Sequence, residues 1–264
     1  MAHAMRSLLQ HRRLIGQMIA TDLRGRYAGS MLGLFWSVVH PVVLVAIYTL
    51  VFSRLMRATL PGESGPYEYS VYLCAGFLGW IGFSEVVTRS TTVFHDRADL
   101  VRQVAFPKAV LHGSIVGAAA VNVALLAIAL VCVLALLRRP LSLSFMLWPP
   151  LLALELAFAA GLGLIGSVVN VFFRDTAQVV TVLLQLWFWV TPIVYPVTVL
   201  PDEVASVFAW NPLLYFTRLQ QELLVSGRLP AWSDLALAGV FAAAALAAGI
   251  SALAAAERKI PDEL

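Results

Sequence analysis

Long apolar runs, separated by short polar segments, make up most of this 264-residue chain. A bilayer-spanning helix needs about 20 mainly apolar residues, so the pattern predicts six spans. They cover about Gly33–Phe52, Val71–Phe94, Ala109–Leu137, Phe145–Phe172, Ala177–Pro196 and Ala231–Ala256. A membrane β-barrel would show short alternating segments instead. We therefore expect an all-α polytopic membrane protein with one transmembrane domain over residues 1–264.

Composition and charge support this class and predict an orientation. Only 12% of the residues are charged, whereas a soluble domain carries about 25%. Cytoplasmic loops of membrane proteins are enriched in Lys and Arg. With both termini inside, eleven of the 18 basic residues fall on the inner side and six on the outer side. Both termini are therefore expected to be cytosolic, and residues 1–26 lack the apolar core of a cleaved signal peptide.

The segment before the first span has its own pattern. Residues 6–23 alternate basic and apolar positions. This pattern predicts an amphipathic helix that lies on the inner membrane surface, with its arginines near anionic headgroups. Together with the small-residue hinge Ala28-Gly29-Ser30, it forms an interface helix and entrance over residues 1–32.

Two segments between the spans also have helical patterns. Residues 96–107 form a short charged stretch with apolar residues on one side. Residues 197–230 contain two helix starts, at Pro201 and at Asn211. We expect two short helices there that dip into the outer leaflet, because they are too short and too polar to span the bilayer.

Charged residues inside the spans are the first candidates for function. Glu85 and Arg89 stand four residues apart, in the favourable order for a helical ion pair. This pair is either structural or part of a polar conduction path. Glu155 has no partner nearby in the sequence, and it either pairs across helices or lines water.

Small residues in the last span predict close helix packing. Gly239, Ala243 and Ala247 recur every four residues. Such a stripe lets two helix backbones approach closely. We interpret it as a packing face and not as a substrate site.

The fifth span carries polar and aromatic residues at helical spacing. Gln178, Thr181, Gln185 and Trp189 share one face, and the sequence TPIVYP then breaks the helix. Amides bind sugar hydroxyls and aromatic rings stack on apolar sugar faces, so this face favours a glycan path. The alternative is a set of interhelical amide contacts beside an interfacial aromatic belt.

Several kinds of chemistry have no signature in the sequence. The chain has only two lysines, Lys108 and Lys259, and neither lies in a phosphate-binding Gly-x-x-x-x-Gly-Lys-Ser/Thr loop. The five histidines do not cluster, and Cys74 and Cys132 both fall in apolar runs. We expect no catalytic residues, no metal and no cofactor in this chain, so a partner or an ion gradient would supply the energy for transport.

Four motifs in order along residues 14–225 resemble permease subunits of type-2 ABC exporters for polysaccharides, the O-antigen and teichoic-acid branch. The first is RYAGSMLGLFWSVVHPVVLVAIYTLVF, with its Arg-Tyr pair, Ser-x-Leu-Gly and Phe-Trp. The others are LVRQVAFPKAVL, NVFFRDTAQVVTVLLQLWFWVTPIVYP and NPLLYFTRLQQELL. Together they are specific, although each alone is weak. After residue 225 only the hydropathy is similar.

The resemblance implies a homodimer of six-span subunits with two separate ATP-binding subunits, which bind the ATP and Mg²⁺. It implies that a lipid-linked polysaccharide enters from the inner leaflet of the bacterial inner membrane, as in lipopolysaccharide biosynthesis. The segment before the first span would be an interface helix, residues 96–106 a coupling helix, and residues 197–230 two outer gate helices.

The resemblance also implies roles for particular residues. Arg24, Arg26 and Tyr27 would hold the lipid diphosphate headgroup at the entrance. The residues expected along the glycan path are Trp36, Tyr48, Gln178, Thr181, Gln185, Trp187, Phe188, Trp189 and Tyr195. Those expected to dock the ATP-binding subunit are Asp96, Arg97, Asp99, Leu100, Val101, Arg102 and Phe106.

Three alternatives stay open. On the same scaffold the cargo could be a drug or a lipid, or a capsular polysaccharide or teichoic acid in place of O-antigen. A membrane-embedded enzyme acting on lipid-linked glycans would need clustered acids or histidines at one membrane face. An ion-coupled secondary transporter often shows inverted repeats, and the sequence shows none.

Overall fold

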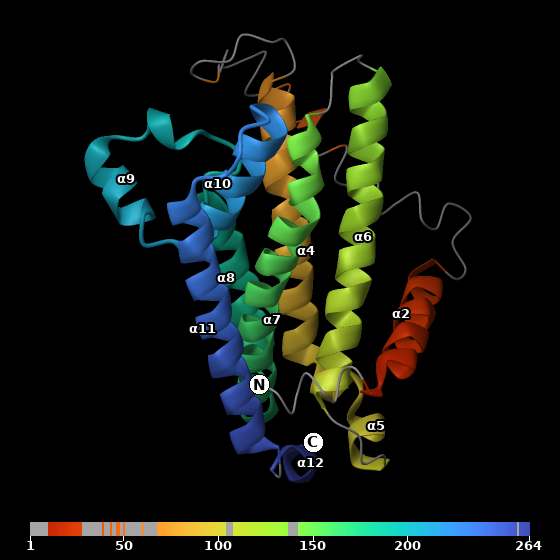
Figure 1. The fold of residues 1–264 in the computed structure, drawn as a ribbon. Coiled ribbons are helices and arrows are strands. Elements are labelled where there is room, and N and C mark those ends of the chain that lie inside the picture. The colour runs from red at the N-terminus through yellow and green to blue at the C-terminus, as the bar shows by residue number, and fades with distance from the viewer. Residues whose placement is uncertain are drawn as a thin grey trace.

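Helices form every regular element in the described part of this computed structural model (Figure 1). The described residues are 10–27, 68–103, 108–136, 142–257 and 259–264, with six isolated positions between 39 and 60. In chain order the elements are α2 (Arg12–Tyr27), α4 (Glu68–Asp96), α5 (Ala98–Gln103), α6 (Ala109–Leu136), η2 (Leu143–Leu147), α7 (Trp148–Phe172), α8 (Thr176–Val190), η3 (Val197–Val199), α9 (Asp202–Phe208), α10 (Pro212–Val225), α11 (Trp232–Ala256) and α12 (Ile260–Glu263).

Four helical segments are long and apolar enough to cross a membrane: α4, α6, α7 with the preceding η2, and α11. They correspond to the predicted second, third, fourth and sixth spans, so the chain is a multi-pass membrane protein. The predicted first span, Gly33–Phe52, lies outside the described residues apart from single positions. The fifth differs from its prediction, because α8 has only 15 residues and the helix ends at Val190, before the two prolines.

The centre of the bundle is α7, which packs against α4 on one side and α11 on the other (Figure 1). Contact between α7 and α11 depends on two glycines. A Cβ atom added at Gly249 would lie 2.5 Å from the carbonyl oxygen of Gly161. The two backbones therefore touch, which side chains larger than hydrogen would prevent.

The packing face predicted for the last span is not the one that faces the bundle. Ala243 and Ala247 are exposed, and Gly239 has open space around it. The buried positions of α11 are instead Asp234, Ala238, Ala242, Ala245, Gly249, Leu253 and Ala256. Small residues occupy every face of this helix, so their spacing alone does not select the face that packs.

The bundle has two distinct ends (Figure 1). We call the end with α5 and α12 the α5 end, and the opposite one, where α9 lies, the α9 end. At the α5 end, Ile260 of α12 is fully buried in a cluster with Val101 of α5. Nearby, burial lowers the pKa of Lys108, and its Nζ donates to the carbonyl oxygen of Glu257.

Residues 197–230 contain two short α-helices, α9 and α10, as the pattern predicts. Most of α9 is exposed. In contrast, α10 packs against α4, α7 and α11. Phe216, Leu219 and Leu223 of α10 are at most 2% exposed, so this helix is part of the bundle core.

Candidate functional site

A chain of polar contacts joins α2, α4 and α6 in the half of the bundle toward the α5 end. Asp22 is the one acidic residue of α2, and its Oδ1 accepts a hydrogen bond from Arg89 Nη2 at 2.5 Å. Arg89 Nη1 donates to Glu85 Oε1 at 3.1 Å. Glu85 Oε2 in turn accepts from Asn122 Nδ2 at 3.0 Å. The predicted pair between Glu85 and Arg89 is thus present, and it continues into two neighbouring helices.

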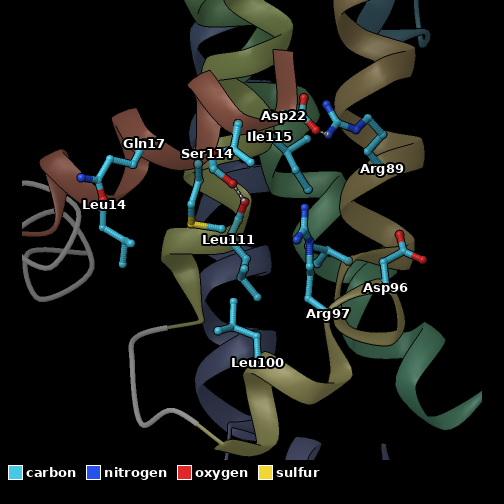
Figure 2. A pocket seen from close by; sticks show the side chains of 13 residues that line it. Leu14, Gln17, Asp22, Arg89, Asp96, Arg97, Leu100, Leu111, Ser114 and Ile115 are labelled. Atoms are coloured by element: carbon cyan, nitrogen blue, oxygen red, sulfur yellow. Dashed lines mark hydrogen bonds and ion pairs between the residues drawn. The ribbon is translucent and has the colours of Figure 1, made fainter. Parts of the chain in front are cut away.

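Beside this chain lies a pocket of about 490 Å³, enclosed by α2, the last turns of α4, α5 and the start of α6 (Figure 2). Asp22 and Arg89 meet at one side of it, and Leu100 of α5 lies at the other. Farther up, α2 is held against α6 by Ile19, which fills the space over Gly117. The pocket therefore separates α2 from α5 while both remain attached to the bundle.

The residues expected to dock an ATP-binding subunit fall into two groups. Asp96, Arg97 and Leu100 line the pocket. Asp99 and Arg102 are exposed on α5, whereas Val101 is buried. Phe106 lies outside the described residues. The exposed charges of this segment therefore lie both beside the pocket, at Asp96 and Arg97, and on α5, at Asp99 and Arg102.

A second buried polar group lies in the half of the bundle toward the α9 end. Glu155 of α7 is 1% exposed, and its Oε2 accepts a hydrogen bond from Gln220 Nε2 of α10. Trp148 Nε1 donates to Gln220 Oε1 at 3.3 Å. Gly79 of α4 leaves room for this group, since a Cβ there would lie 2.6 Å from Glu155 Oε2. Of the two readings of Glu155, the structure favours pairing across helices.

The helix break after α8 is stabilised by side chains from α4 and α10. The hydroxyl of Tyr69 donates to the Val194 carbonyl at 2.5 Å, and Tyr72 donates to the carbonyls of Pro192 and Tyr195. Gln221 Nε2 donates to the Pro192 carbonyl at 3.1 Å. Buried backbone carbonyls need such partners. The break is therefore a defined part of the fold, held by specific hydrogen bonds.

Asn211 closes the same region from the start of α10. Its side chain accepts from the Leu213 backbone N–H and from Trp187 Nε1, and it donates to Thr191 Oγ1. Asn211 is thus both the N-cap of α10 and the link between α10 and the end of α8.

The residues predicted to line a glycan path divide according to their exposure. Gln178, Gln185 and Trp189 lie exposed on α8, and Thr181 is partly exposed beside them. Trp187, Phe188 and Tyr195 are half-buried and make contacts within the chain. Trp187 donates a hydrogen bond to Asn211, and Phe188 packs on Phe77 and Trp80. The Tyr195 hydroxyl donates to the Trp189 carbonyl. The amide-bearing face of α8 is therefore open in the single chain, with only Leu184 of this helix buried.

Residues 13–224 match the model of a protein family whose description is ABC-2 type transporter. The chain belongs to this family. Permeases of the family are transporter components without an ATPase site and work with separate ATP-binding subunits, in line with the absence of a P-loop motif here.

Individual relatives are similar over most of their length. The chain is 33% identical over 233 residues to the O-antigen export system permease protein RfbA of Myxococcus xanthus, covering 87% of each chain. It is 31% identical to a protein of the same name from Klebsiella pneumoniae, over 79% of this chain and 78% of the relative. It is 24% identical to the polysialic acid transport protein KpsM of Escherichia coli, over 87% and 88%.

The family match runs from α2 into the last turns of α10, so the pocket and both polar groups of this permease lie within it. The predicted entrance is only partly described. Arg24 is exposed on α2, and Arg26 and Tyr27 belong to its last turn. Trp36 and Tyr48 lie outside the described residues.

Sequence reasoning missed the partners that complete each polar group: Asp22, Asn122, Trp148, Gln220 and Gln221. Two signals could have found some of them. Asp22 is a single acid in an otherwise basic amphipathic helix. Gln220 and Gln221 interrupt the apolar face of α10, where a polar side chain needs a buried partner.

Proposed function

We propose that this chain is the membrane-spanning subunit of an ATP-driven exporter for a lipid-linked polysaccharide, with an O-antigen carried on an undecaprenyl diphosphate-type lipid as the first candidate. The observation that carries the proposal is the 33% identity to an O-antigen export permease over 87% of both chains. In this proposal the chain has six spans, lies in the bacterial inner membrane and has both termini in the cytosol. It would serve lipopolysaccharide biosynthesis.

The exposed face of α8 supports a homodimer with the transport path between the subunits. Most of its apolar residues are open in the single chain, including Leu183, Leu186 and Val190, which are 47–60% exposed. Gln178 and Gln185 are exposed on the same helix. Amides among apolar and aromatic side chains suit a neutral glycan, since they offer hydrogen bonds without a fixed charge.

The α5 end supports docking of the ATP-binding subunits on α5, which would be the coupling helix. Asp99 and Arg102 are exposed there, while Val101 anchors α5 in the cluster below the bundle. A displacement of α5 by the ATP-binding subunit would then be transmitted to α7 and α12 through these packed side chains. The interface helix in this scheme is α2, with Arg24 at the level of the headgroups.

The α9 end supports a gate formed by α9 and α10. The exposed helix α9 is connected to the buried helix α10, which is fixed by the hydrogen bonds of Gln220 and Asn211. Outward movement of α9 could therefore occur while α10 keeps its place.

The experiment that tests the function is fractionation of a bacterial strain lacking this gene. An exporter predicts that lipid-linked polysaccharide disappears from the surface and accumulates on the cytosolic face. Loss of the ATP-binding subunit must give the same result, which an ion-coupled transporter would not. Unchanged surface polysaccharide would point to a drug or lipid cargo. Polymer missing from both places would point to an enzyme, because synthesis itself would have failed.

Similarity to KpsM, a polysialic acid transport protein, supports capsular polysaccharide as the second candidate cargo. Analysis of which surface glycan is lost from the deletion strain separates the two. Loss of the O-antigen with normal capsule supports the first candidate, and the opposite result supports the second.

A further inference from the structure

The pocket below α2 has the properties of a binding site for an amphiphilic molecule. Its volume of about 490 Å³ is within the roughly 300–1,000 Å³ that is usual for ligand pockets. One part of its lining is apolar and comes from all the surrounding helices: Leu14, Met18, Val93, Leu100, Leu111 and Ile115. The remaining part carries charge.

The charges of the lining are two arginines and two aspartates, and they differ in whether they already have partners. Arg89 and Asp22 are paired with each other at 2.5 Å. The guanidinium group of Arg97 points into the pocket (Figure 2) and makes no hydrogen bond or ion pair with any described residue. Asp96 precedes it and accepts one hydrogen bond, from Thr92 at 2.7 Å. Among the described residues, the pocket thus offers one unpaired cation with a carboxylate beside it, and both side chains are exposed.

The depth of Asp96 and Arg97 in the membrane follows from their position along the chain. Asp96 is the last residue of α4, which is apolar and long enough to span the bilayer. Arg97 follows directly. The ends of spanning helices lie at the level of the lipid headgroups, so Asp96 and Arg97 are at headgroup depth, and Val93 and Ile115 of the lining lie farther along α4 and α6, toward the acyl chains.

We propose that this pocket binds a zwitterionic phospholipid whose headgroup carries a primary ammonium, that is, a phosphatidylethanolamine. The guanidinium of Arg97 binds the phosphate oxygens, for which its planar donors are suited. The carboxylate of Asp96 binds the ammonium group, and the apolar lining covers the first part of the acyl chains. The bound lipid fills the space between α2 and α5 and thereby connects them.

Charge balance favours this headgroup over other phosphate-bearing lipids. An anionic phospholipid satisfies Arg97 but brings no cation to Asp96. A polyprenyl diphosphate brings still more negative charge next to the two aspartates of the lining. Only a headgroup with both signs pairs each of the two side chains with its opposite.

Native mass spectrometry of the full chain, stripped of lipid in detergent and then given defined lipids, tests the proposal. Phosphatidylethanolamine should bind as a single retained adduct. Arg97→Gln should weaken this binding at least about tenfold, as expected for loss of a charge-assisted hydrogen bond. Arg12→Gln is the matched control, because Arg12 is exposed on α2 and does not line the pocket; it should bind as the unmodified chain does.

Two further variants keep the test decisive. Asp96→Asn should reduce the preference for phosphatidylethanolamine over phosphatidylglycerol, since only the former has the ammonium group. Gln17→Trp places a large side chain from an exposed position of α2 into the pocket and should reduce binding even if Arg97→Gln fails to fold.

Three results would overturn the proposal: equal binding by Arg97→Gln and Arg12→Gln, phosphatidylglycerol binding as tightly as phosphatidylethanolamine, or displacement of phosphatidylethanolamine by a polyprenyl diphosphate. The last would assign the pocket to the cargo lipid. Since the readout is lipid binding and not export, its failure leaves the exporter function untouched.

Discussion

The α5 end and the α9 end of the bundle differ in how their polar side chains are satisfied. At the α5 end the contacts include an ion pair that solvent partly reaches: the side chains of Arg89 and Asp22 are 31% and 19% exposed. At the α9 end the contacts are mostly neutral hydrogen bonds to backbone carbonyls. Ile193 and Val194, at the centre of that region, are fully buried.

This difference has consequences for movement. Breaking a partly exposed ion pair costs little, since water replaces the lost partner. A buried carbonyl or amide has no water to replace its partner, so its loss costs the full desolvation penalty. The contact of α2 with α4 at the α5 end is therefore able to open at low cost, while the α8 break and α10 remain fixed. Four predictions test this comparison, from the largest expected effect on stability to the smallest.

The largest effect is expected for Gln220→Leu. This change removes the donor to Glu155 and the acceptor for Trp148 and leaves a carboxyl group unpaired in the core. Interhelical hydrogen bonds in membranes contribute about 0.6–1.7 kcal/mol, and the unpaired group adds about 1–3 kcal/mol. We expect the free energy of unfolding in detergent to fall by about 2–3 kcal/mol. Gln185→Leu, at an exposed position of α8, is the control and should change it little.

A smaller loss is expected for Gly79→Ala. The added Cβ would lie 2.6 Å from Glu155 Oε2 and 2.7 Å from Gln220 Nε2, so the pair has to move apart. Overpacking of this kind costs about 1–3 kcal/mol. Gly239→Ala should instead stabilise α11 by about 0.5–1 kcal/mol, because nothing lies near that position. Equal effects of the two changes would contradict the tight packing described around Glu155.

At the α5 end, Arg89→Gln should cost no more than about 1 kcal/mol of global stability. Its main effect is local: amide hydrogens of α2 should exchange faster, because α2 loses its ion pair with α4. A double-mutant cycle with Asp22→Asn isolates the pair. A coupling energy well above 1 kcal/mol would show that this end is as rigid as the other.

The smallest effect on stability is expected for the double change Arg24→Gln with Arg26→Gln. Surface substitutions usually change stability by less than about 0.5 kcal/mol, and Arg24 is exposed. Membrane insertion should therefore be unchanged, while export of polysaccharide falls several-fold if these arginines bind the lipid diphosphate. Arg228→Gln, exposed near the α9 end, is the control. Normal export by the double variant would reject the headgroup role.

The sequence could predict features that depend on local patterns. The length of the apolar runs predicted the first residues of α6 and α11 to within one position. The expected starts were Ala109 and Ala231, and the helices begin at Ala109 and Trp232. The spacing of Glu85 and Arg89 located their ion pair because both lie on one helix. Each of these depends only on residues near one another in the chain.

Features that depend on distant residues could not be predicted. The early end of α8 is stabilised by Tyr69 and Tyr72, more than a hundred residues away. Glu155 is hydrogen-bonded to Gln220, which lies 65 positions away in the sequence. The same limit applies to the packing face of α11. Several small residues of this helix look equivalent in the sequence, and Gly249 is the one that packs because it lies against Gly161 of α7.

The contact between Gly161 and Gly249 has a mechanical consequence. Helices that touch through their backbones cannot rotate or slide past each other without collision, because no side chain is present to change its rotamer and absorb the shift. In effect α7 and α11 form one rigid strut. During a transport cycle, movement is therefore expected in the helices that are joined to the bundle by longer side chains, namely α2, α5 and the exposed helix α8. They move relative to α7 and α11, which stay fixed.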